Sequence, residues 1–290
     1  MDRAPSPLLL DRRSTGRTLV MGVLNVTPDS FSDGGDHFAL AEAVSAARRM
    51  AAEGVDIIDI GGESTRPGAV AIDAETELQR IMPVIADLVA SGAPPLSIDT
   101  YKASVADAAL KAGVRIVNDV TGLRRDPAIA AVTAAHDAVL VIGHWEWELT
   151  YGPGAIMDGM LHFFDRAIAA ARAAGVSEER LVLDPGIGFG KDAAENLAIL
   201  AGLPRLVALG HPVLVGASRK RFIGTLTGRE PRERLLGTLG AHLVAAAKGA
   251  SIVRAHDVAP HREALAVADA ILSAPAALTA ATPERDTAIR

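Results

Sequence analysis

The chain has 290 residues and a formal net charge of −6. Hydrophobic residues make up 49% and charged residues 22%, a balance typical of globular proteins and not of disordered chains. This mild acidity does not favour a nucleic-acid partner, because proteins that bind nucleic acid usually carry a basic stripe. The absence of cysteine excludes disulfides, thiolate zinc sites and a cysteine nucleophile, and it fits a reducing compartment.

The sequence carries no evident signal for a membrane or for export. No apolar run approaches the roughly 20 residues of a transmembrane helix. The apolar cluster at residues 8–10 is followed at once by Asp11-Arg12-Arg13, so it is too short for a signal peptide. We therefore expect a cytoplasmic protein with neither a membrane nor a nucleic-acid partner.

Eight short apolar runs alternate with longer helical patterns along the chain. The runs predict strands at 19–24, 55–60, 96–98, 114–117, 138–142, 181–183, 213–215 and 251–253. They are nearly continuous in apolar character, as expected for strands covered on both faces. The patterns between them predict helices at 39–52, 74–89, 103–112, 127–136, 156–174, 193–208, 231–248 and 260–272. Proline at 127, 231 and 260 suits the first turns of three of these helices.

Eight strand–helix pairs in strict order predict a parallel sheet. Eight is also the number of units in a closed (β/α)8 TIM barrel, so we expect an α/β protein of that fold with a single domain. A doubly wound sheet is the structural alternative. We expect the barrel to span residues 18–273, with an N-terminal extension at 1–17 and a flexible C-terminal tail at 274–290.

A polar residue stands where each apolar run stops. In such barrels the active site lies at the carboxyl ends of the strands. The residues at these eight ends are Asn25, Asp59, Asp99, Asn118-Asp119, His144, Asp184, Ser218-Arg219-Lys220 and Arg254-Ala255-His256. Any one of them has an ordinary explanation as a helix cap or a turn residue. Capping explains all eight together less well. Histidines other than His144 and His256 lie in predicted helices or loops, and we interpret them as structural or solvated.

The types of these residues indicate a chemistry. Asp99, Asn118 and Asp184 can face a flat heterocycle that presents paired hydrogen-bond donors and acceptors, although they can also satisfy one another. Lys220, Arg254 and His256 end the last two runs. Barrel enzymes often hold phosphate there, and arginine has the fork geometry that phosphate prefers.

Two further features point to a ligand with phosphate groups. Asn25 and the nearby Asp29 offer oxygen atoms that can hold a magnesium ion shared with substrate phosphates. Arg66 lies in a loop rich in glycine and proline, where it either closes over a ligand or remains an exposed loop arginine.

Several of these strings together resemble the dihydropteroate synthases, the folate-pathway enzymes targeted by sulfonamides. The matching segments are MGVLNVTPDSFSDGG at 21–35, DIIDIGGESTRPG at 56–68, LDPGIGFGK at 183–191, SRK at 218–220 and RAHD at 254–257. The resemblance runs from about Met21 to Leu272, and its first two segments are long and specific.

The resemblance implies a (β/α)8 barrel that forms a homodimer. It also implies a transferase reaction. In that reaction 6-hydroxymethyl-7,8-dihydropterin diphosphate condenses with p-aminobenzoate to give 7,8-dihydropteroate and diphosphate. It also implies a magnesium ion near Asn25 and sulfonamides as competing ligands.

Roles follow residue by residue where the motifs match. The resemblance assigns pterin binding to Asp99, Asn118, Asp184 and Lys220. It assigns diphosphate binding to Asn25, Arg254 and His256. It places Thr65 and Arg66 on a second loop near the substrates, and Phe189 and Ser218 near the p-aminobenzoate pocket. The catalytic set that it implies is Asp99, Asp184, Lys220, Arg254 and His256.

One region departs from the family pattern. The chain reads GHWEWEL at 143–149, where the family usually has methionine before the histidine. Gly143 thus lacks an apolar side chain expected to pack against the pterin. Trp145 and Trp147 either refill that space or cover the mouth of the site, or else they pack on the surface of a variable loop. An altered response to sulfonamides, including resistance, is a hypothesis that this loop leaves open.

Two other functions compete with the synthase. A pterin-binding methyltransferase module shares the barrel and the pterin pocket, and a catalytically silent paralogue binds without turnover. The first-loop string, the Ser64-Thr65-Arg66-Pro67 segment and Ser218-Arg219-Lys220 favour the synthase, because a methyl carrier needs no diphosphate pocket. A silent copy should have lost charged strand-end residues, and every expected one is present.

Overall fold

The structure is a computed structural model that describes residues 10–27, 35–64, 70–145, 151–152 and 154–274. Its strands form one parallel sheet in the order β6-β5-β4-β3-β2-β1-β8-β7. They are β1 (Leu19–Asn25), β2 (Ile57–Gly61), β3 (Leu96–Asp99), β4 (Ile116–Asp119), β5 (Val139–Gly143), β6 (Leu181–Asp184), β7 (Leu214–Val215) and β8 (Ile252–Ala255). All eight predicted strands are present, with ends shifted by one or two residues.

The sheet curls into a nearly closed barrel. The first strand pairs with both the second and the last, and a parallel bridge between Leu183 and Val213 joins β6 to β7. The Leu183 N–H also donates to the Pro212 carbonyl at 2.9 Å. A doubly wound sheet has two free edges and no such bridge, so the TIM-barrel prediction is confirmed.

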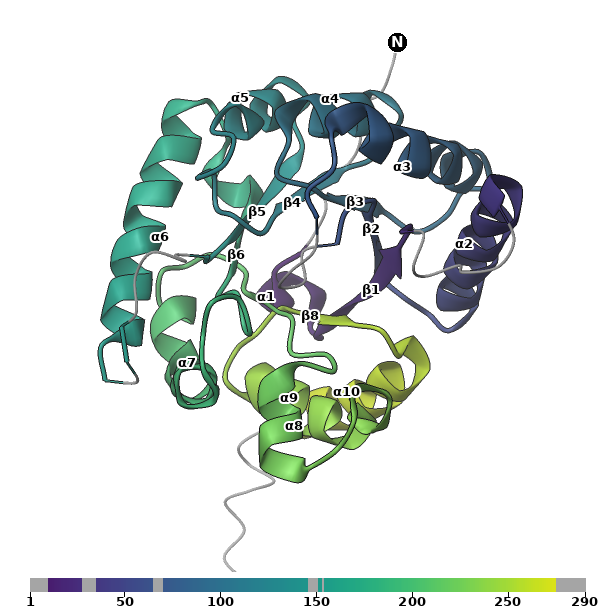
Figure 1. The fold of residues 1–290 in the computed structure, drawn as a ribbon. Helices are drawn as coiled ribbons and strands as arrows, with labels where there is room; N and C mark the ends of the chain where they lie inside the picture. The colour runs from purple at the N-terminus through teal and green to yellow at the C-terminus, as the bar shows by residue number, and fades with distance from the viewer. Residues whose placement is uncertain (1–9, 28–34, 65–69, 146–150, 153, 275–290) are drawn as a thin grey trace, which may run out of the picture.

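Helices surround the barrel as an outer ring, and the first helix of the chain is seen inside that ring (Figure 1). They are α1 (Arg12–Thr15), α2 (Gly35–Ala52), α3 (Ala74–Ala90), α4 (Ala103–Lys111), α5 (Ala128–Ala135), α6 (Ile156–Ala173), α7 (Ala193–Val207), α8 (Arg221–Thr227), α9 (Leu235–Ala247) and α10 (Val258–Leu272). Short 3-10 helices lie at Glu178–Arg180 and Pro231–Glu233.

The single helix predicted over 231–248 is wrong. A 3-10 turn at Pro231–Glu233 comes first, Arg234 has φ −85° and ψ 13°, and α9 begins only at Leu235. The side chain of Arg234 donates to the carbonyls of Arg219 and Lys220, and this tertiary contact fixes the break. Helices α1 and α8 are not predicted, because they are too short to show helical periodicity.

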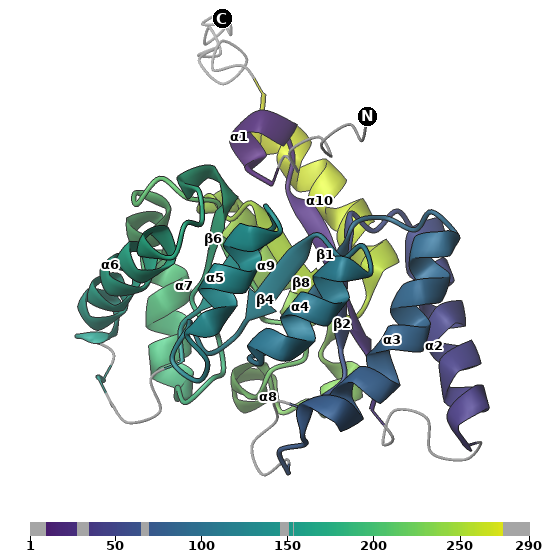
Figure 2. The ribbon, with the colours of Figure 1, turned by 90° about the horizontal axis from the view of Figure 1, so that it is seen from above.

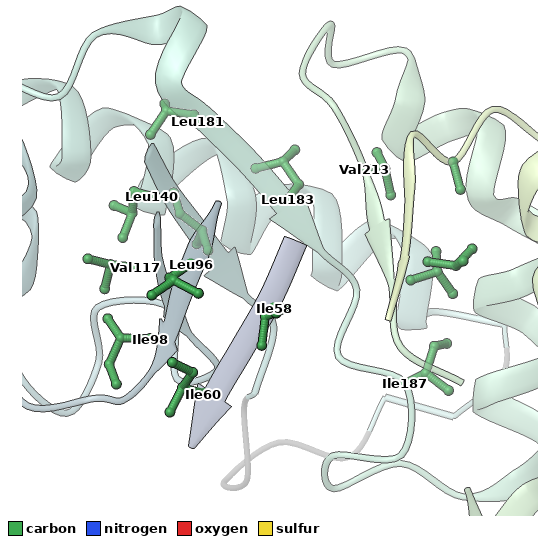
Figure 3. Close-up of a cluster of buried hydrophobic side chains, with 14 of the residues drawn as sticks. Ile58, Ile60, Leu96, Ile98, Val117, Leu140, Leu181, Leu183, Ile187 and Val213 are labelled. Carbon is green, nitrogen blue, oxygen red and sulfur yellow. The ribbon is translucent and has the colours of Figure 1, made fainter. Parts of the chain in front are cut away.

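The barrel strands alternate between an outward and an inward set of apolar side chains, because successive residues of a strand point to opposite faces. Figure 3 shows part of the outward set, including Ile58, Ile60, Leu96 and Ile98. The inward set is a separate cluster that fills the barrel: Leu10, Leu19, Met21, Ile57, Ile116, Val139, Val141, Val182, Leu214 and Ile252.

The segment before β1 packs on the barrel. Leu10 is buried in the inward cluster. Arg12 in α1 pairs with Asp269 at 2.8 Å and donates to the Ala246 carbonyl at 2.5 Å. Figure 2 shows α1 beside α10 at one end of the barrel, with α8 at the other end. The domain boundaries at 17/18 and 273/274 remain predictions.

No helix in the described part of the chain is both long enough and apolar enough to span a membrane.

Candidate active site

Inward-facing positions change from apolar to polar at the carboxyl ends of the strands. Residues two apart on a strand point to the same face. The side chains two positions after Ile57, Ile116, Val182 and Ile252 therefore also point into the barrel. These positions hold Asp59, Asn118, Asp184 and Arg254. Asp99 joins them because it lies beside Asn118 in the register of β3 and β4. Five of the predicted strand-end residues are therefore brought together, whereas Asp119 accepts from Thr121 and Leu123 in its own loop and His144 packs against Phe163.

Arg254 lies between two carboxylates. Its Nε atom is 2.6 Å from Oδ2 of Asp59, and its Nη2 atom is 2.8 Å from Oδ2 of Asp99. Burial alone lowers the pKa of the Arg254 guanidinium, but the carboxylates of Asp59 and Asp99 outweigh it and raise the pKa. Arg254 therefore stays charged and holds both carboxylates in fixed orientations.

Three oxygen atoms in this polar layer lack partners among the described residues. They are the Oδ1 atoms of Asp59, Asp99 and Asn118, and all three are buried. Asn118 uses its Nδ2 atom to donate to Asp59 at 3.0 Å. The polar groups thus satisfy one another only in part. An unpaired buried acceptor costs about 1–3 kcal/mol, so this layer is suited to a ligand that offers several N–H donors.

Two carboxyl groups of the layer are shifted toward the protonated form. Burial raises the pKa of Asp99 to about 7, although Arg254 opposes the shift. Burial also raises the pKa of Asp184, opposed by Lys220 and by the Gly186 N–H, which donates to Asp184 Oδ1 at 2.8 Å. Carboxyl groups with shifted pKa values that are gathered in one place are typical of catalytic centres.

Lys220 reaches the same layer from the turn after β7. Its Nζ atom donates to the Ile187 carbonyl and lies 4.4 Å from the centre of the Phe189 ring. Burial lowers the pKa of Lys220 to about 8, while Asp184 opposes the shift. Gly188 makes this approach possible, since a Cβ there would lie 2.8 Å from Lys220 Cδ.

Ser218 and His256 join the last two strand ends. The Ser218 hydroxyl is 2.9 Å from Nδ1 of His256 and accepts the His256 backbone N–H at 3.2 Å. Next to them Arg219 forms an ion pair with Asp257 at 2.6 Å. The turn with Ser218, predicted to lie near the p-aminobenzoate pocket, is therefore linked to the segment with His256, predicted to bind the diphosphate.

Asn25 is the described residue that fits a cation shared with a ligand. Its Oδ1 atom and Oδ2 of Asp99 each lie 3.8 Å from the position that a Cβ on Gly61 would take. Within the described ranges no three His, Cys, Asp or Glu residues gather as a metal site. Magnesium is often held by one or two protein oxygens together with substrate phosphates, and Asn25 fits that mode. Asp29 lies outside the described residues.

Thr65 and Arg66 lie outside the described residues, but the segment that leads to them is held firmly. The Glu63 carboxylate pairs with Lys102 and accepts from the Tyr101 hydroxyl at 2.7 Å. Lys102 also pairs with the buried Glu77 at 2.5 Å. These contacts fix the start of the second loop beside β3.

The structure corrects the expectation for Gly143. A Cβ on this residue would lie 2.6 Å from Cα of Val120, so the backbone after β4 already fills the space. No gap remains for tryptophan to refill. Trp145 instead packs near Phe189, with ring centres 5.1 Å apart, whereas Trp147 lies outside the described residues.

The site contains one acidic residue that the sequence analysis did not select. Asp59 was seen as a strand end but was given no role, yet it is fully buried and binds both Arg254 and Asn118. Its position two residues after the inward-facing Ile57 was the signal that could have identified it.

The chain is similar to known proteins over most of its length. The family model described as "Pterin binding enzyme" matches residues 21–256. The dihydropteroate synthase of Bacillus subtilis is 45% identical over 257 residues, which cover 89% of this chain and 90% of the relative. This chain belongs to the dihydropteroate synthase family. It is accordingly an enzyme, a transferase with dihydropteroate synthase activity.

Solved structures of dihydropteroate synthases share the fold. The Xanthomonas albilineans enzyme with 4-aminobenzoic acid is 49% identical, has a TM-score of 0.85, and the match covers 89% of this chain and 94% of that one. The same enzyme has been solved with 7,8-dihydropteroate (45% identity, TM-score 0.83, 92% and 97% covered). The Yersinia pestis enzyme in a sulfonamide complex is 38% identical with a TM-score of 0.85, covering 94% of this chain and 99% of that one. None of these comparisons supports an altered response to sulfonamides.

Proposed function

We propose that this barrel joins 6-hydroxymethyl-7,8-dihydropterin diphosphate to p-aminobenzoate and releases 7,8-dihydropteroate and diphosphate. The observation that carries the proposal is the buried layer of Asp59, Asp99 and Asn118 with its three unpaired oxygens. A pterin has several ring N–H and amino donors on one edge, and these match such a set of acceptors. The 7,8-dihydropteroate complex of the Xanthomonas albilineans relative supports the assignment.

The pterin is assigned to Asp99, Asn118, Asp184 and Lys220. Asp99 and Asp184 accept from the N–H edge, and Asn118 can both donate and accept. Lys220 donates to an acceptor on the opposite edge. Arg254 fixes the carboxylates of Asp59 and Asp99 before the pterin binds, which lowers the ordering cost of binding.

The diphosphate is assigned to Asn25, Arg254 and His256. Arg254 lies near the end of β8 and His256 directly follows this strand, where phosphate is commonly held in barrels. Asn25 would hold magnesium through its amide oxygen, and the bound ion would balance the negative charge that grows on the leaving diphosphate.

The p-aminobenzoate is assigned to the neighbourhood of Phe189 and Ser218, with Thr65 and Arg66 contributing from the second loop. The Phe189 ring contacts both Trp145 and the Nζ atom of Lys220, which lies over the ring. Sulfonamides would compete there, in line with the sulfonamide complex of the Yersinia pestis relative.

The reaction needs charge stabilisation more than a strong base. The bond between the pterin methylene carbon and the diphosphate oxygen breaks, and the oxygen keeps the electron pair. Positive charge develops on the pterin, near the carboxylates of Asp99 and Asp184, and negative charge develops near Arg254 and His256. The aniline amine is neutral at pH 7, attacks the methylene carbon and then loses one proton. Holding the two partners together supplies much of the remaining rate.

Turnover of the purified chain with dihydropterin diphosphate, p-aminobenzoate and magnesium tests the proposal, and repeating it with sulfamethoxazole tests competition. Dihydropteroate formation that is lost in Asp184→Ala and in Arg254→Ala supports it. Pterin diphosphate binding without product contradicts it in favour of a silent paralogue. Pterin binding with no diphosphate release points to a methyl-carrier module.

We also propose that two copies pair through α9 and α10. These helices lie side by side (Figure 1) and expose large apolar side chains to solvent. Leu236 is 80% exposed, Val267 60% and Ile271 69%. The spacing of Val267 and Ile271 by four residues places them on one helix face. An exposed apolar face of this kind is typical of a protein–protein interface.

A further inference from the structure

One face of α9 contacts the backbone of the turn that carries Ser218 and Lys220. Arg234, Thr238 and His242 are spaced by four residues, so they share this face. The Ala217 N–H donates to His242 Nε2 at 2.9 Å, and the Arg219 N–H donates to Thr238 Oγ1 at 3.0 Å.

Arg234 completes this set of contacts from the N-terminal end of α9. Its Nη1 atom donates to the carbonyl of Arg219 at 3.1 Å and to that of Lys220 at 3.4 Å. Gly224 in α8 leaves room for the guanidinium, because a Cβ there would lie 2.2 Å from Arg234 Nη2. Two side chains of α9 and that of the residue directly before it thus bind four backbone groups of the turn, from Ala217 to Lys220.

The turn needs such support. Arg219 has φ +58°, in the left-handed region, and it is not a glycine. A residue with a Cβ in that region is strained by about 1–2 kcal/mol, and the strain persists only where surrounding contacts over-determine it. The strained residue stands directly between Ser218 and Lys220, so its conformation sets the directions of both side chains.

The contact made by His242 continues to the other side of the site. Its Nδ1 atom is 2.9 Å from Nε2 of His261, and Nδ1 of His261 is 2.6 Å from the carbonyl of Asp257. Both rings are completely buried. Asp257 directly follows His256 in the chain, so the two histidines connect the turn after β7 with the segment after β8.

The hydrogen bonds determine the protonation of the pair. A backbone N–H can only donate, so His242 Nε2 accepts and the proton of this ring is on Nδ1. That proton is donated to His261 Nε2, and His261 in turn donates from Nδ1 to the Asp257 carbonyl. All three bonds exist together only when both rings are neutral and carry the proton on Nδ1.

We propose that Arg234, Thr238 and His242 are positioning residues for Ser218 and Lys220, and that His261 extends this positioning to the segment that carries His256. The inference rests on the substrate-binding roles proposed above for Ser218 and Lys220. Nothing in it requires either histidine to contact a substrate.

The surroundings of the pair favour the neutral form. Burial lowers the pKa of His242, and His261, Lys220 and His256 around it lower it further. Burial also lowers the pKa of His261, although the Asp257 carbonyl and carboxylate oppose this shift. Protonation of His242 would remove the acceptor for the Ala217 N–H, so acid should release the turn.

The first test compares two variants of His242. His242→Leu removes the acceptor, and we expect kcat/KM for the pterin diphosphate to fall at least about 10-fold, because the Ala217 N–H is left buried without a partner. His242→Gln can accept from Ala217 and donate to His261, so we expect it to stay within about threefold of the unmodified enzyme. His162→Leu, at an exposed position on α6, is the matched control.

The comparison of pH profiles separates positioning from simple loss of stability. Because burial keeps His242 neutral well below the ordinary pKa of histidine, the two profiles should coincide near pH 7. In more acid solution the His242→Gln enzyme should lose less kcat/KM than the unmodified enzyme, because glutamine takes up no proton. A His242→Leu enzyme that folds and keeps its full kcat/KM would overturn the proposal. So would a glutamine variant as impaired as the leucine variant.

Two further measurements test the proposal even if the leucine variant does not fold. Thr238→Val should lower kcat/KM while Thr238→Ser restores it, because serine keeps the acceptor for the Arg219 N–H. Nitrogen NMR of the full chain should find both histidine rings neutral with the proton on Nδ1 at pH 7, and another tautomer would refute the link. An unmodified chain without turnover would instead refute the proposed function, and the NMR result would still decide the link.

Discussion

Arg254 and Asp59 are separated by 195 residues in the chain, yet Nε of the one lies 2.6 Å from Oδ2 of the other. The contact spans β1, because β2 and β8 flank that strand on its two sides. Closure of the barrel is therefore what brings a cation to the carboxylates assigned to the pterin. The pairing also explains how a buried aspartate and a buried arginine persist in the same layer.

Replacing Asp59 by asparagine should lower catalytic efficiency without abolishing it. The variant keeps the side-chain shape but loses the charge that holds Arg254, and a hydrogen bond to a charged group contributes about 1.5–3 kcal/mol. We expect kcat/KM for the pterin diphosphate to fall by about 10- to 100-fold. Steady-state kinetics check this, with thermal unfolding to confirm folding and Asp87→Asn on the surface as control. An unchanged kcat/KM would show that Asp59 does not organise the site.

The raised pKa of Asp99 predicts a pH-dependent stability. A carboxyl group whose pKa is higher in the folded chain binds more protons when folded, so its contribution is present at low pH and is lost as pH rises. For Asp99 the window runs from ~4, the unfolded value, to about 7 in the folded chain. Urea unfolding at several pH values should find Asp99→Asn gaining stability relative to the unmodified chain across this window, by ~1 kcal/mol or more. A constant difference would contradict the shift.

Gly188 should be required for the position of Lys220. A Cβ at this residue would lie 2.8 Å from Lys220 Cδ, and the residue has φ +82°. We expect Gly188→Ala to lower kcat/KM at least about tenfold by displacing Lys220, in addition to about 1 kcal/mol of backbone strain. Gly92→Ala is the matched control, because Gly92 has φ +68° and no atom within 4 Å of the added Cβ. If both variants lose the same activity, strain alone is responsible.

The proposed dimer can be tested by placing charge on its apolar face. Leu236→Glu combined with Val267→Glu should shift the sedimenting species from dimer to monomer, because two desolvated carboxylates would face each other across the interface. Leu197→Glu on α7, which is 42% exposed, is the control outside the face. A double variant that remains dimeric at low micromolar concentration would place the interface elsewhere.

The local pattern of the chain was enough to predict the fold. Nearly continuous apolar runs such as 138–142 are typical of strands covered on both faces, and β5 is found at Val139–Gly143. Proline at position 260 marked the first turn of α10, which begins at Val258. Local patterns failed where a distant contact decides. The break at Arg234 depends on a bond to the turn after β7, and no periodicity within 231–248 records it.

The candidate site was also predicted only in part from the sequence. Motif and strand position together selected residues such as Asn118 and Asp184, and the barrel brings them to one layer. The sequence could not indicate that Asp59 pairs with Arg254, or that the space at Gly143 is occupied by the backbone after β4. Both facts depend on how neighbouring strands are staggered, which is a property of the closed sheet.

The sequence by itself determined the order and type of the elements, the residues that end each strand and the family to which the chain belongs. These properties depend on spacing along the chain and on side-chain chemistry, which a sequence states directly. Only the tertiary structure decided which charges pair, which oxygens remain without partners, and that His242 and His261, interpreted at first as merely structural or solvated, connect two strand ends. Such relations depend on distance and desolvation between residues far apart in the chain, and folding alone sets both.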